Sequence, residues 1–276
     1  MDTHTETPPD CDCSVHPSIF YLLATLVLTS CSSAMLCASI MTDHWEHVAW
    51  DHNALSALAN ASNTALHWLL DEKVAKIEDP YNAKGGTFLV PMNGGIWTMC
   101  IALEDEELSI LSRAGFPTQP ACTNYLANDD DEEPRADWQH RMQNLSISCA
   151  LVCLIVLGSA ALVGAFGVCN HQISAVLVTG VMYLLAGLFA MFTLMIIHFK
   201  RIQRVSFRSA HIGDGTDDGV IGPNMAAMNL LSAREFSTAW SLELGWGGVV
   251  FAIITSLLWI TLSKIMRYNP ISAMLL

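Results

Sequence analysis

Four long apolar runs dominate this chain, and a long polar segment separates the first run from the second. None of the runs contains Lys or Arg. A helix needs about 20 apolar residues to cross roughly 30 Å of hydrocarbon, whereas an amphipathic helix of a soluble protein keeps a polar face. We therefore predict an integral membrane protein, mainly α-helical, with four transmembrane helices. The runs lie near Ile19–Met41, Ile147–Cys169, Ile173–Ile197 and Leu242–Leu262.

The charge distribution supports this fold class. Only 14% of the residues are charged, against about a quarter in a typical soluble domain. The net charge is −13, and residues 42–146 alone hold 17 acidic and 6 basic residues. Such a chain is unsuited to nucleic acid, which requires clustered Lys and Arg. We interpret the polar segment as a solvated acidic surface, with a basic partner as the alternative.

The first apolar run is interpreted as a retained helix rather than a cleaved signal peptide. Residues 1–17 carry no Lys or Arg, and the run is longer than the core of a signal peptide. The predicted order is a cytoplasmic arm (1–17), helix 1 (18–41), a first extracellular or lumenal loop (42–146), helix 2 (147–169), a cytoplasmic turn (170–172), helix 3 (173–198), a second outer loop (199–240), helix 4 (241–263) and a cytoplasmic tail (264–276).

Two sequence features disagree about the orientation of these helices. Asn60 begins an Asn-Ala-Ser acceptor pattern for N-linked glycosylation, which places the first loop outside or in a lumen. The pattern at Asn144 abuts helix 2 and is too close to the membrane to be used. Basic residues between Lys200 and Arg208 favour the opposite orientation, because short cytoplasmic segments are rich in Lys and Arg. We expect cytoplasmic termini, since the loop cysteines also require an oxidising compartment.

Cys100 and Cys122 are the best candidates for a disulfide. They are 22 positions apart in the first loop, and the cysteines from Cys31 onward that lie elsewhere fall in or beside the apolar runs. A bridge of this span would stabilise the folded loop by roughly 3 kcal/mol. Within Thr87–Leu103, strand-forming residues flank the Gly94-Gly95 pair, which predicts two short strands and a turn. Residues 53–79 are interpreted as an amphipathic helix followed by a loop.

Glu243 is a candidate intramembrane polar residue, close to the outer end of helix 4. A carboxylate at mid-bilayer costs about 3 kcal/mol and less near the edge. It is interpreted as an interfacial residue that reaches water. The alternatives are a partner-binding or proton-linked site and an internal ion pair, with His198, Lys200 and Thr193 as candidate neighbours at similar depth.

The sequence lacks the common catalytic motifs. We find no HExxH, paired CxxC, GxSxG or phosphate-binding glycine loop. We therefore predict that the protein is not an enzyme and that it needs no cofactor or metal.

Several of these residues together resemble the superfamily of claudins, peripheral myelin protein and voltage-dependent calcium-channel gamma subunits. Members have four helices and a long first extracellular loop with a Trp, Gly-Leu-Trp, Cys, Cys pattern. Here Ile96 replaces the Leu, and the cysteine spacing is about double that of claudins. The matching positions are Trp45, Gly95-Ile96-Trp97, Cys100 and Cys122.

Within this superfamily the chain looks most similar to the transmembrane protein 178 branch. The features that carry the similarity are the cysteine spacing, Thr42-Asp43-His44-Trp45 after helix 1 and Ala136-Asp137-Trp138-Gln139-His140 before helix 2. The resemblance implies a left-handed bundle of four transmembrane helices, capped by a small antiparallel β-sheet in the first extracellular loop. It also implies that Trp45 and Trp97 pack where the sheet meets the membrane, and that the disulfide joins neighbouring strands.

The resemblance implies two functions. The first is a membrane accessory protein that regulates an ion channel or calcium signalling, through contacts with a channel or calcium-handling partner or by self-association. The second is a claudin-like junction protein, in which the acids that follow Cys100 favour cation permeability. A transporter is a third candidate, with Glu243 as its polar group. The expected location is the plasma membrane or the endoplasmic reticulum.

Overall fold

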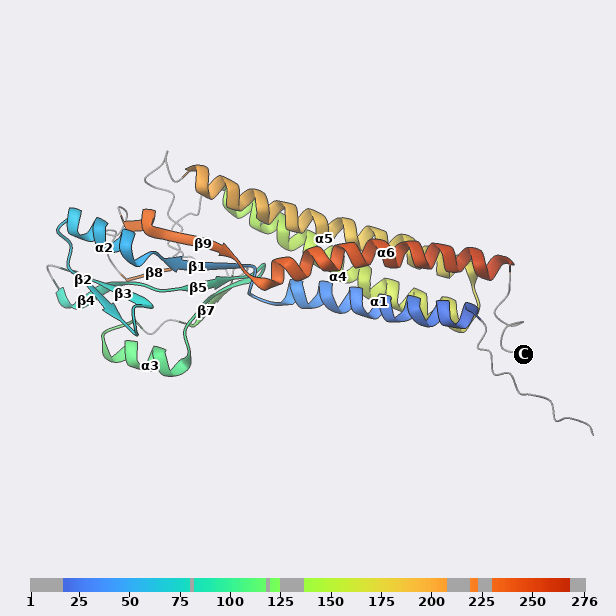
Figure 1. The fold of residues 1–276 in the computed structure, drawn as a ribbon, viewed down its shortest axis with the longest axis horizontal. Coiled ribbons are helices and arrows are strands. Elements are labelled where there is room, and N and C mark those ends of the chain that lie inside the picture. The colour runs from blue at the N-terminus through green and yellow to red at the C-terminus, as the bar shows by residue number, and fades with distance from the viewer. Residues whose placement is uncertain are drawn as a thin grey trace, which may run out of the picture.

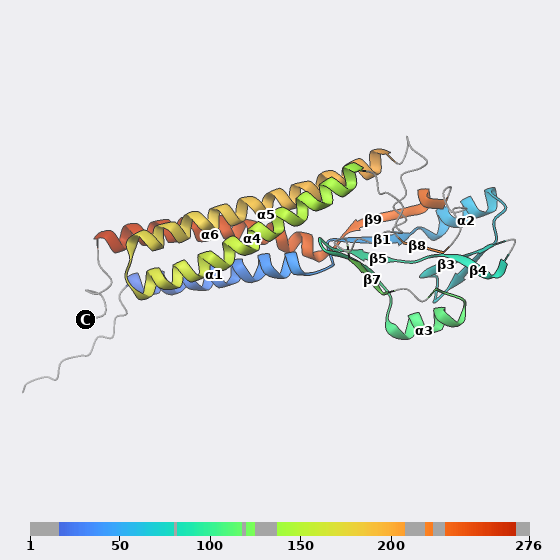
Figure 2. The ribbon, with the colours of Figure 1, turned by 180° about the vertical axis from the view of Figure 1, so that it is seen from behind.

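Four long helices pack together, and a β-rich domain lies at one end of them (Figures 1 and 2). The computed structural model describes residues 17–79, 82–117, 120–124, 137–207, 219–222 and 230–268. The predicted N-terminal arm and most of the predicted C-terminal tail therefore lie outside the described residues.

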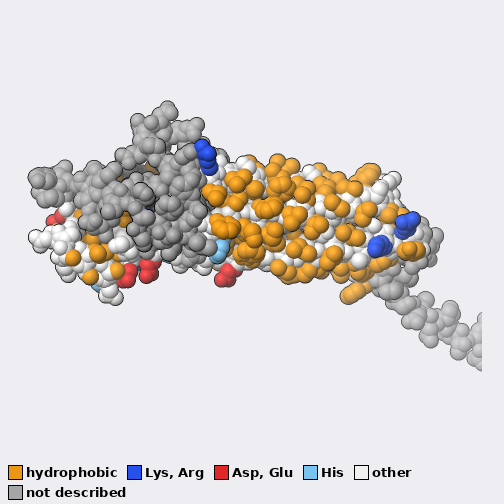
Figure 3. All heavy atoms as spheres, turned by 90° about the horizontal axis from the view of Figure 1, so that it is seen from above, with side chains coloured by type: hydrophobic (Ala, Val, Ile, Leu, Met, Phe, Trp, Pro, Cys, Tyr) orange, Lys and Arg blue, Asp and Glu red, His pale blue; other side chains and the backbone are white. Residues whose placement is uncertain are grey.

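The four helices are long and apolar enough to cross a bilayer. They are α1 (Pro17–Met41), α4 (Asp137–Cys169), α5 (Ile173–Phe207) and α6 (Trp240–Tyr268). The 29 residues of α6 extend about 43 Å at 1.5 Å per residue, which exceeds the hydrocarbon thickness of roughly 30 Å. Hydrophobic side chains cover the visible face of the bundle, and Lys and Arg lie near its ends (Figure 3). The chain is thus a multi-pass membrane protein.

Three of these helices extend past the predicted spans, and α6 does so by ending at Tyr268 rather than at residue 263. α4 begins at Asp137, whereas the predicted span starts at residue 147, and α5 continues to Phe207 rather than ending at 198. A hydropathy pattern marks only the part of a helix that lipid surrounds. The pattern therefore does not show the polar turns of α4 and α5 that lie nearest the β-rich domain.

The helices pack in the order α1, α6, α5, α4, and small residues bring them close together. A Cβ atom on Gly248 would lie 2.7 Å from the Leu36 side chain, and one on Gly180 would lie 3.1 Å from the backbone oxygen of Ser256. Glycines allow this approach, and close backbone packing holds helices together in lipid.

Hydrogen bonds between hydroxyl groups and buried aromatic side chains also join the helices. The Trp259 indole of α6 donates to the Thr29 hydroxyl of α1 over 2.9 Å, and the Tyr183 hydroxyl of α5 lies 3.0 Å from that of Ser33. Each pair satisfies polar groups that lipid could not. These contacts tie α1 to two different helices.

The β-rich domain consists of two antiparallel sheets and two short helices, α2 (His52–Ala61) and α3 (Asp105–Arg113). We call it the cap domain. One sheet has the order β7-β6-β5-β1-β9, and the other β2-β3-β4-β8. The strands are β1 (Glu46–Trp50), β2 (Leu66–Leu69), β3 (Val74–Asp79), β4 (Asn82–Leu89), β5 (Met92–Gly94), β6 (Thr98–Ile101), β7 (Cys122–Asn124), β8 (Val220–Ile221) and β9 (Arg234–Thr238).

Both polar segments of the chain build the cap domain. β9, which follows the 3₁₀ turn η2 (Leu230–Ala233), pairs with β1 along its length. β8 pairs with β4 through Phe88 and Leu89. The sequence did not predict these two strands, because β8 has only two residues and β9 is largely polar, so neither shows a strand pattern.

Residues 53–79 differ from the predicted helix and loop. Asp51 begins α2 by accepting hydrogen bonds from the backbone N–H groups of Asn53 and Ala54, as an N-cap residue does. The helix ends at Ala61, and the rest forms the β2–β3 hairpin. Its turn holds three successive left-handed residues, at φ 53°, 51° and 69°: Leu70, Asp71 and Glu72.

Candidate functional site

The residues of the Trp, Gly-Ile-Trp, Cys, Cys pattern meet at the joint between the cap domain and the bundle. The Trp45 side chain is 3% exposed, and its indole N–H donates to the backbone oxygen of Ser39 over 2.7 Å. The Trp97 indole donates to the backbone oxygen of Ile40 over 2.8 Å. Carbonyls in the last turn of a helix lack intrahelical partners, so both rings complete the end of α1.

Gly95 lies in the turn between β5 and β6, where no side chain fits. Its backbone N–H donates to the oxygen of Thr98, and a Cβ atom here would lie 2.7 Å from the Cα of Asp43. The turn therefore sits directly against the segment that follows α1. This close approach explains why the chain has a glycine at position 95.

Ile96 connects the same turn to a third element. Its side chain is fully buried among the residues of the bundle core. Its backbone oxygen accepts a 2.6 Å hydrogen bond from the side-chain amide of Gln143 on α4, which is itself buried. The tripeptide thus contacts α1 through Trp97 and α4 through Ile96.

α6 completes the joint from the other side. The Ser39 hydroxyl donates to the backbone oxygen of Ser241 over 2.8 Å, and the Thr42 hydroxyl lies 2.8 Å from the Ser241 hydroxyl. The Ser241 backbone N–H donates to the oxygen of His44. The cap domain is therefore hydrogen-bonded to α1, α4 and α6 at one place.

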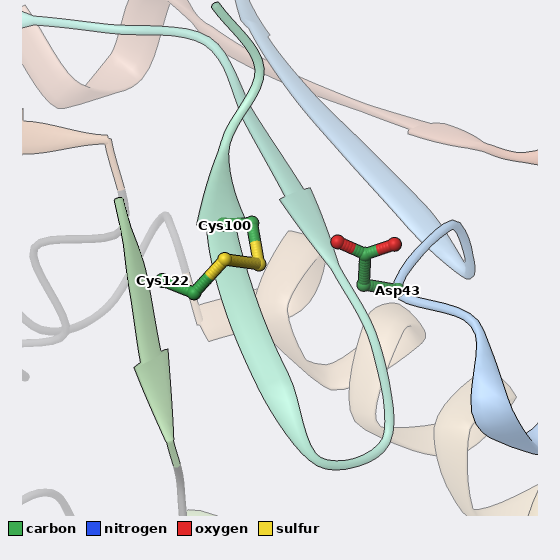
Figure 4. A group of neighbouring side chains, drawn as sticks. All are labelled: Asp43, Cys100 and Cys122. Atoms are coloured by element: carbon green, nitrogen blue, oxygen red, sulfur yellow. A yellow bond between two sulfur atoms is a disulfide. The ribbon is translucent and has the colours of Figure 1, made fainter. Parts of the chain in front are cut away.

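A disulfide between Cys100 and Cys122 joins β6 to β7. The two residues are directly opposite in the antiparallel pair, with Cα atoms 4.0 Å apart. Asp43 lies beside them (Figure 4), and its carboxylate contacts the His44 ring over 2.9 Å. Both sulfur atoms are used in the disulfide, so neither is a thiolate that could bind a metal with Asp43.

An ion pair links the β2–β3 turn to α3 within the cap domain. Lys73 donates to the Glu107 carboxylate, which also accepts from the backbone N–H of Glu104. The hydrogen bond from Lys73 is the main cause that lowers the pKa of Glu107, and the Glu104 N–H adds to it. The same contact raises the pKa of Lys73. Three acids in its first turn also suit α3, whose N-terminus is the positive end of the helix dipole.

The remaining predicted site residues lie apart from the joint or at its rim. Asn60 is exposed near the end of α2, and Glu243 is exposed in the first turn of α6. Of the candidate neighbours of Glu243, Thr193 is buried and donates to the Phe189 oxygen of its own helix, whereas His198 is exposed. The Lys200 side chain lies outside the described residues. The proposed roles of Asn60 and Glu243 stay predictions.

Sequence reasoning missed three residues of the joint: Ser39, Gln143 and Ser241. Ser39 is inside an apolar run and so looks like part of a membrane span. Gln143 and Ser241 donate to backbone oxygens, and because every residue has such an oxygen, these bonds cannot be predicted from the sequence. The one available signal was the position of Gln143, a polar residue one turn before the predicted start of helix 2.

Comparison of the sequence with protein-family models gives no match, and comparison with curated proteins gives none either. The resemblance to the claudin and gamma-subunit superfamily therefore depends on the four helices, the capping sheet, the disulfide and the pattern residues themselves.

Proposed function

We propose that this protein is a non-enzymatic accessory subunit that regulates an ion channel or a calcium-handling protein in the same membrane. The joint is the observation that carries the proposal, because two buried hydrogen bonds tie the cap domain to α1 and α4, and the His44 oxygen just before β1 accepts from the Ser241 N–H of α6. A partner that contacts both the cap domain and the helices meets one preorganised surface. Groups that are ordered before binding lose less entropy on association.

The outward face of α4 offers such a partner a close approach. Gly158, Ala161 and Ala165 are exposed there, and a Cβ atom on Gly158 would meet no other atom within 4 Å. Leu162 and Phe166 project beside them, with 76% and 56% of their surface exposed. Small residues between large ones let the backbone of a second helix come near in lipid. The resemblance to channel gamma subunits directs the proposal toward channels.

In this proposal the cap domain lies outside the cell or in a lumen, and both termini are cytoplasmic. The Cys100–Cys122 disulfide supports this orientation, because such bonds persist only in oxidising compartments. Basic residues between 200 and 208 favour the reverse by the positive-inside rule, and their side chains lie outside the described residues. The plasma membrane and the endoplasmic reticulum both fit.

The proposal is tested by calcium entry in cells that lack the protein. Wild-type protein and a Val178→Leu control on the exposed face of α5 should restore calcium entry and copurify with the same channel in mild detergent. Ala161→Leu should do neither, because the added side chain fills the face of α4. A protein that migrates alone, together with calcium entry that is equal with and without it, would refute the proposal.

A junction protein is the second candidate, and the acidic first turn of α3 favours it. Glu104, Asp105 and Glu106 are exposed on the cap domain, in the segment that follows Cys100. Acidic side chains that line a path between cells would favour cations. This reading requires the native protein at cell contacts and a change of transepithelial resistance on knockdown. A stain confined to internal membranes would eliminate it.

A further inference from the structure

We propose that Asn60 carries an N-linked glycan that covers the end of the cap domain farthest from the membrane. α2 lies at the end of the cap domain opposite the bundle (Figures 1 and 2). The helix buries Leu55 and Ala59 against the cap domain. The opposite face of the helix is exposed. It comprises Asn53 and the residues four, seven and eight positions after it, which are Ala57, Asn60 and Ala61.

In an Asn-x-Ser pattern the asparagine side chain accepts the glycan, provided that the segment is accessible. The side-chain amide nitrogen of Asn60 would form a bond to C1 of a sugar on a lipid diphosphate donor. The C1–oxygen bond to the diphosphate breaks, the diphosphate leaves with the electron pair, and the amide loses one proton. In the folded protein the Ser62 hydroxyl is exposed and donates to the Leu58 oxygen over 2.9 Å.

The second pattern of this kind in the chain is unsuitable. Asn144 lies in α4 within the candidate span Arg141–Cys169. The hydroxyl-bearing residue of its pattern, Ser146, is 1% exposed and packs inside the protein. Of the two Asn-x-Ser patterns in the sequence, Asn60 alone combines an exposed acceptor with distance from the bundle.

A glycan at this position has a consequence for binding. Asn60 and Ala57 share the exposed face of α2, one turn apart. A flexible glycan would shield that face from other proteins. Contacts of the cap domain would then have to be made through its sides and the helices, which are surfaces that a partner in the same membrane can reach. The inference rests on the orientation in the proposed function.

The first experiment expresses the full-length protein in cells and treats it with a peptide N-glycosidase. Wild type, Ser62→Thr and the control Asn144→Gln should each lose the mass of one glycan, and Asn60→Gln should migrate like the treated protein. An unshifted wild type with an intact Cys100–Cys122 disulfide refutes the glycan and leaves the orientation standing. An unshifted wild type with both cysteines reduced refutes both.

The second experiment measures the shielding. A cysteine introduced by Ala57→Cys is labelled with a small maleimide and with a large polyethylene glycol maleimide, before and after glycosidase treatment. The large reagent should react several-fold faster after treatment, and the small one equally in both cases. The control Ile110→Cys on α3, where the native side chain is 54% exposed, should show no change. Equal rates for the large reagent at Ala57→Cys would overturn the shielding.

Discussion

Replacing Gly95 by Ala tests whether the joint holds the cap domain to the bundle. The new Cβ would lie 2.7 Å from the Cα of Asp43 and 3.2 Å from the backbone oxygen of Thr42. Carbon atoms pack at about 3.5–4.0 Å, so the turn and the segment after α1 must separate by about 0.8 Å. Both are backbone, so no side-chain rotation can relieve the contact.

The energetic cost follows from what this separation disturbs. Three hydrogen bonds cross the same gap or close the turn: Trp45 N–H to the Gly94 oxygen at 2.9 Å, the Gly95 N–H to Thr98 at 2.8 Å, and the Trp97 indole to Ile40 at 2.8 Å. Overpacking a tight site costs about 1–3 kcal/mol. We therefore expect the free energy of unfolding of the cap domain to fall by about 1–3 kcal/mol. A loss of about 1.4 kcal/mol changes the folding equilibrium constant tenfold.

The assay is urea unfolding of the protein in detergent, followed by tryptophan emission. The midpoint for Gly95→Ala should fall without a change in slope, since the exposed surface on unfolding is the same. Gly158→Ala is the matched control, because its Cβ meets nothing within 4 Å, and it should not lower the midpoint, since Ala is the better helix former by about 1 kcal/mol. Equal midpoints for wild type and Gly95→Ala would show that the close approach is not a structural constraint.

Three further predictions concern the cap domain. Replacing Cys100 and Cys122 together by Ser should cost about 3 kcal/mol for a separation of 22 residues, and a reductant should then have no further effect on urea unfolding. The pKa of Glu107 is lowered from its ordinary value of 4.5, so the ionised carboxylate stabilises the folded protein. This contribution is complete above pH 4.5 and is lost as the pH falls through the lowered pKa. Glu107→Gln should therefore lose less stability than wild type on acidification, and parallel curves would contradict this. Asp71→Gly should raise the free energy of unfolding by about 1 kcal/mol, and with it the urea midpoint, because φ is 51° and a left-handed residue with a Cβ is strained; a lowered midpoint would count against strain.

Much of the fold could be predicted because it depends on local composition. The four spans follow from unbroken apolar runs, since lipid excludes unpaired backbone groups and charged side chains whatever the neighbouring helices are. The predicted strands on either side of the Gly94–Gly95 pair are present, and so is the disulfide between the two loop cysteines. The pattern residues Trp45, Gly95 and Trp97 identified the joint without revealing what they contact.

What the sequence alone determined about this protein is therefore that it lies in a lipid bilayer, that four of its helices are long and apolar enough to cross it, and which few residues form the joint. Only the tertiary structure decided that the second polar segment contributes β8 and β9. It also decided that Gln143, the Ser39 oxygen and the Ser241 N–H bond the cap domain to α4, α1 and α6. The physical reason is range. Burial in lipid can be predicted from neighbouring residues along the chain. Strand pairing and hydrogen bonds to backbone oxygens instead join segments that are far apart in sequence. Nearly every residue has the same backbone groups, so the sequence does not show which of them will pair.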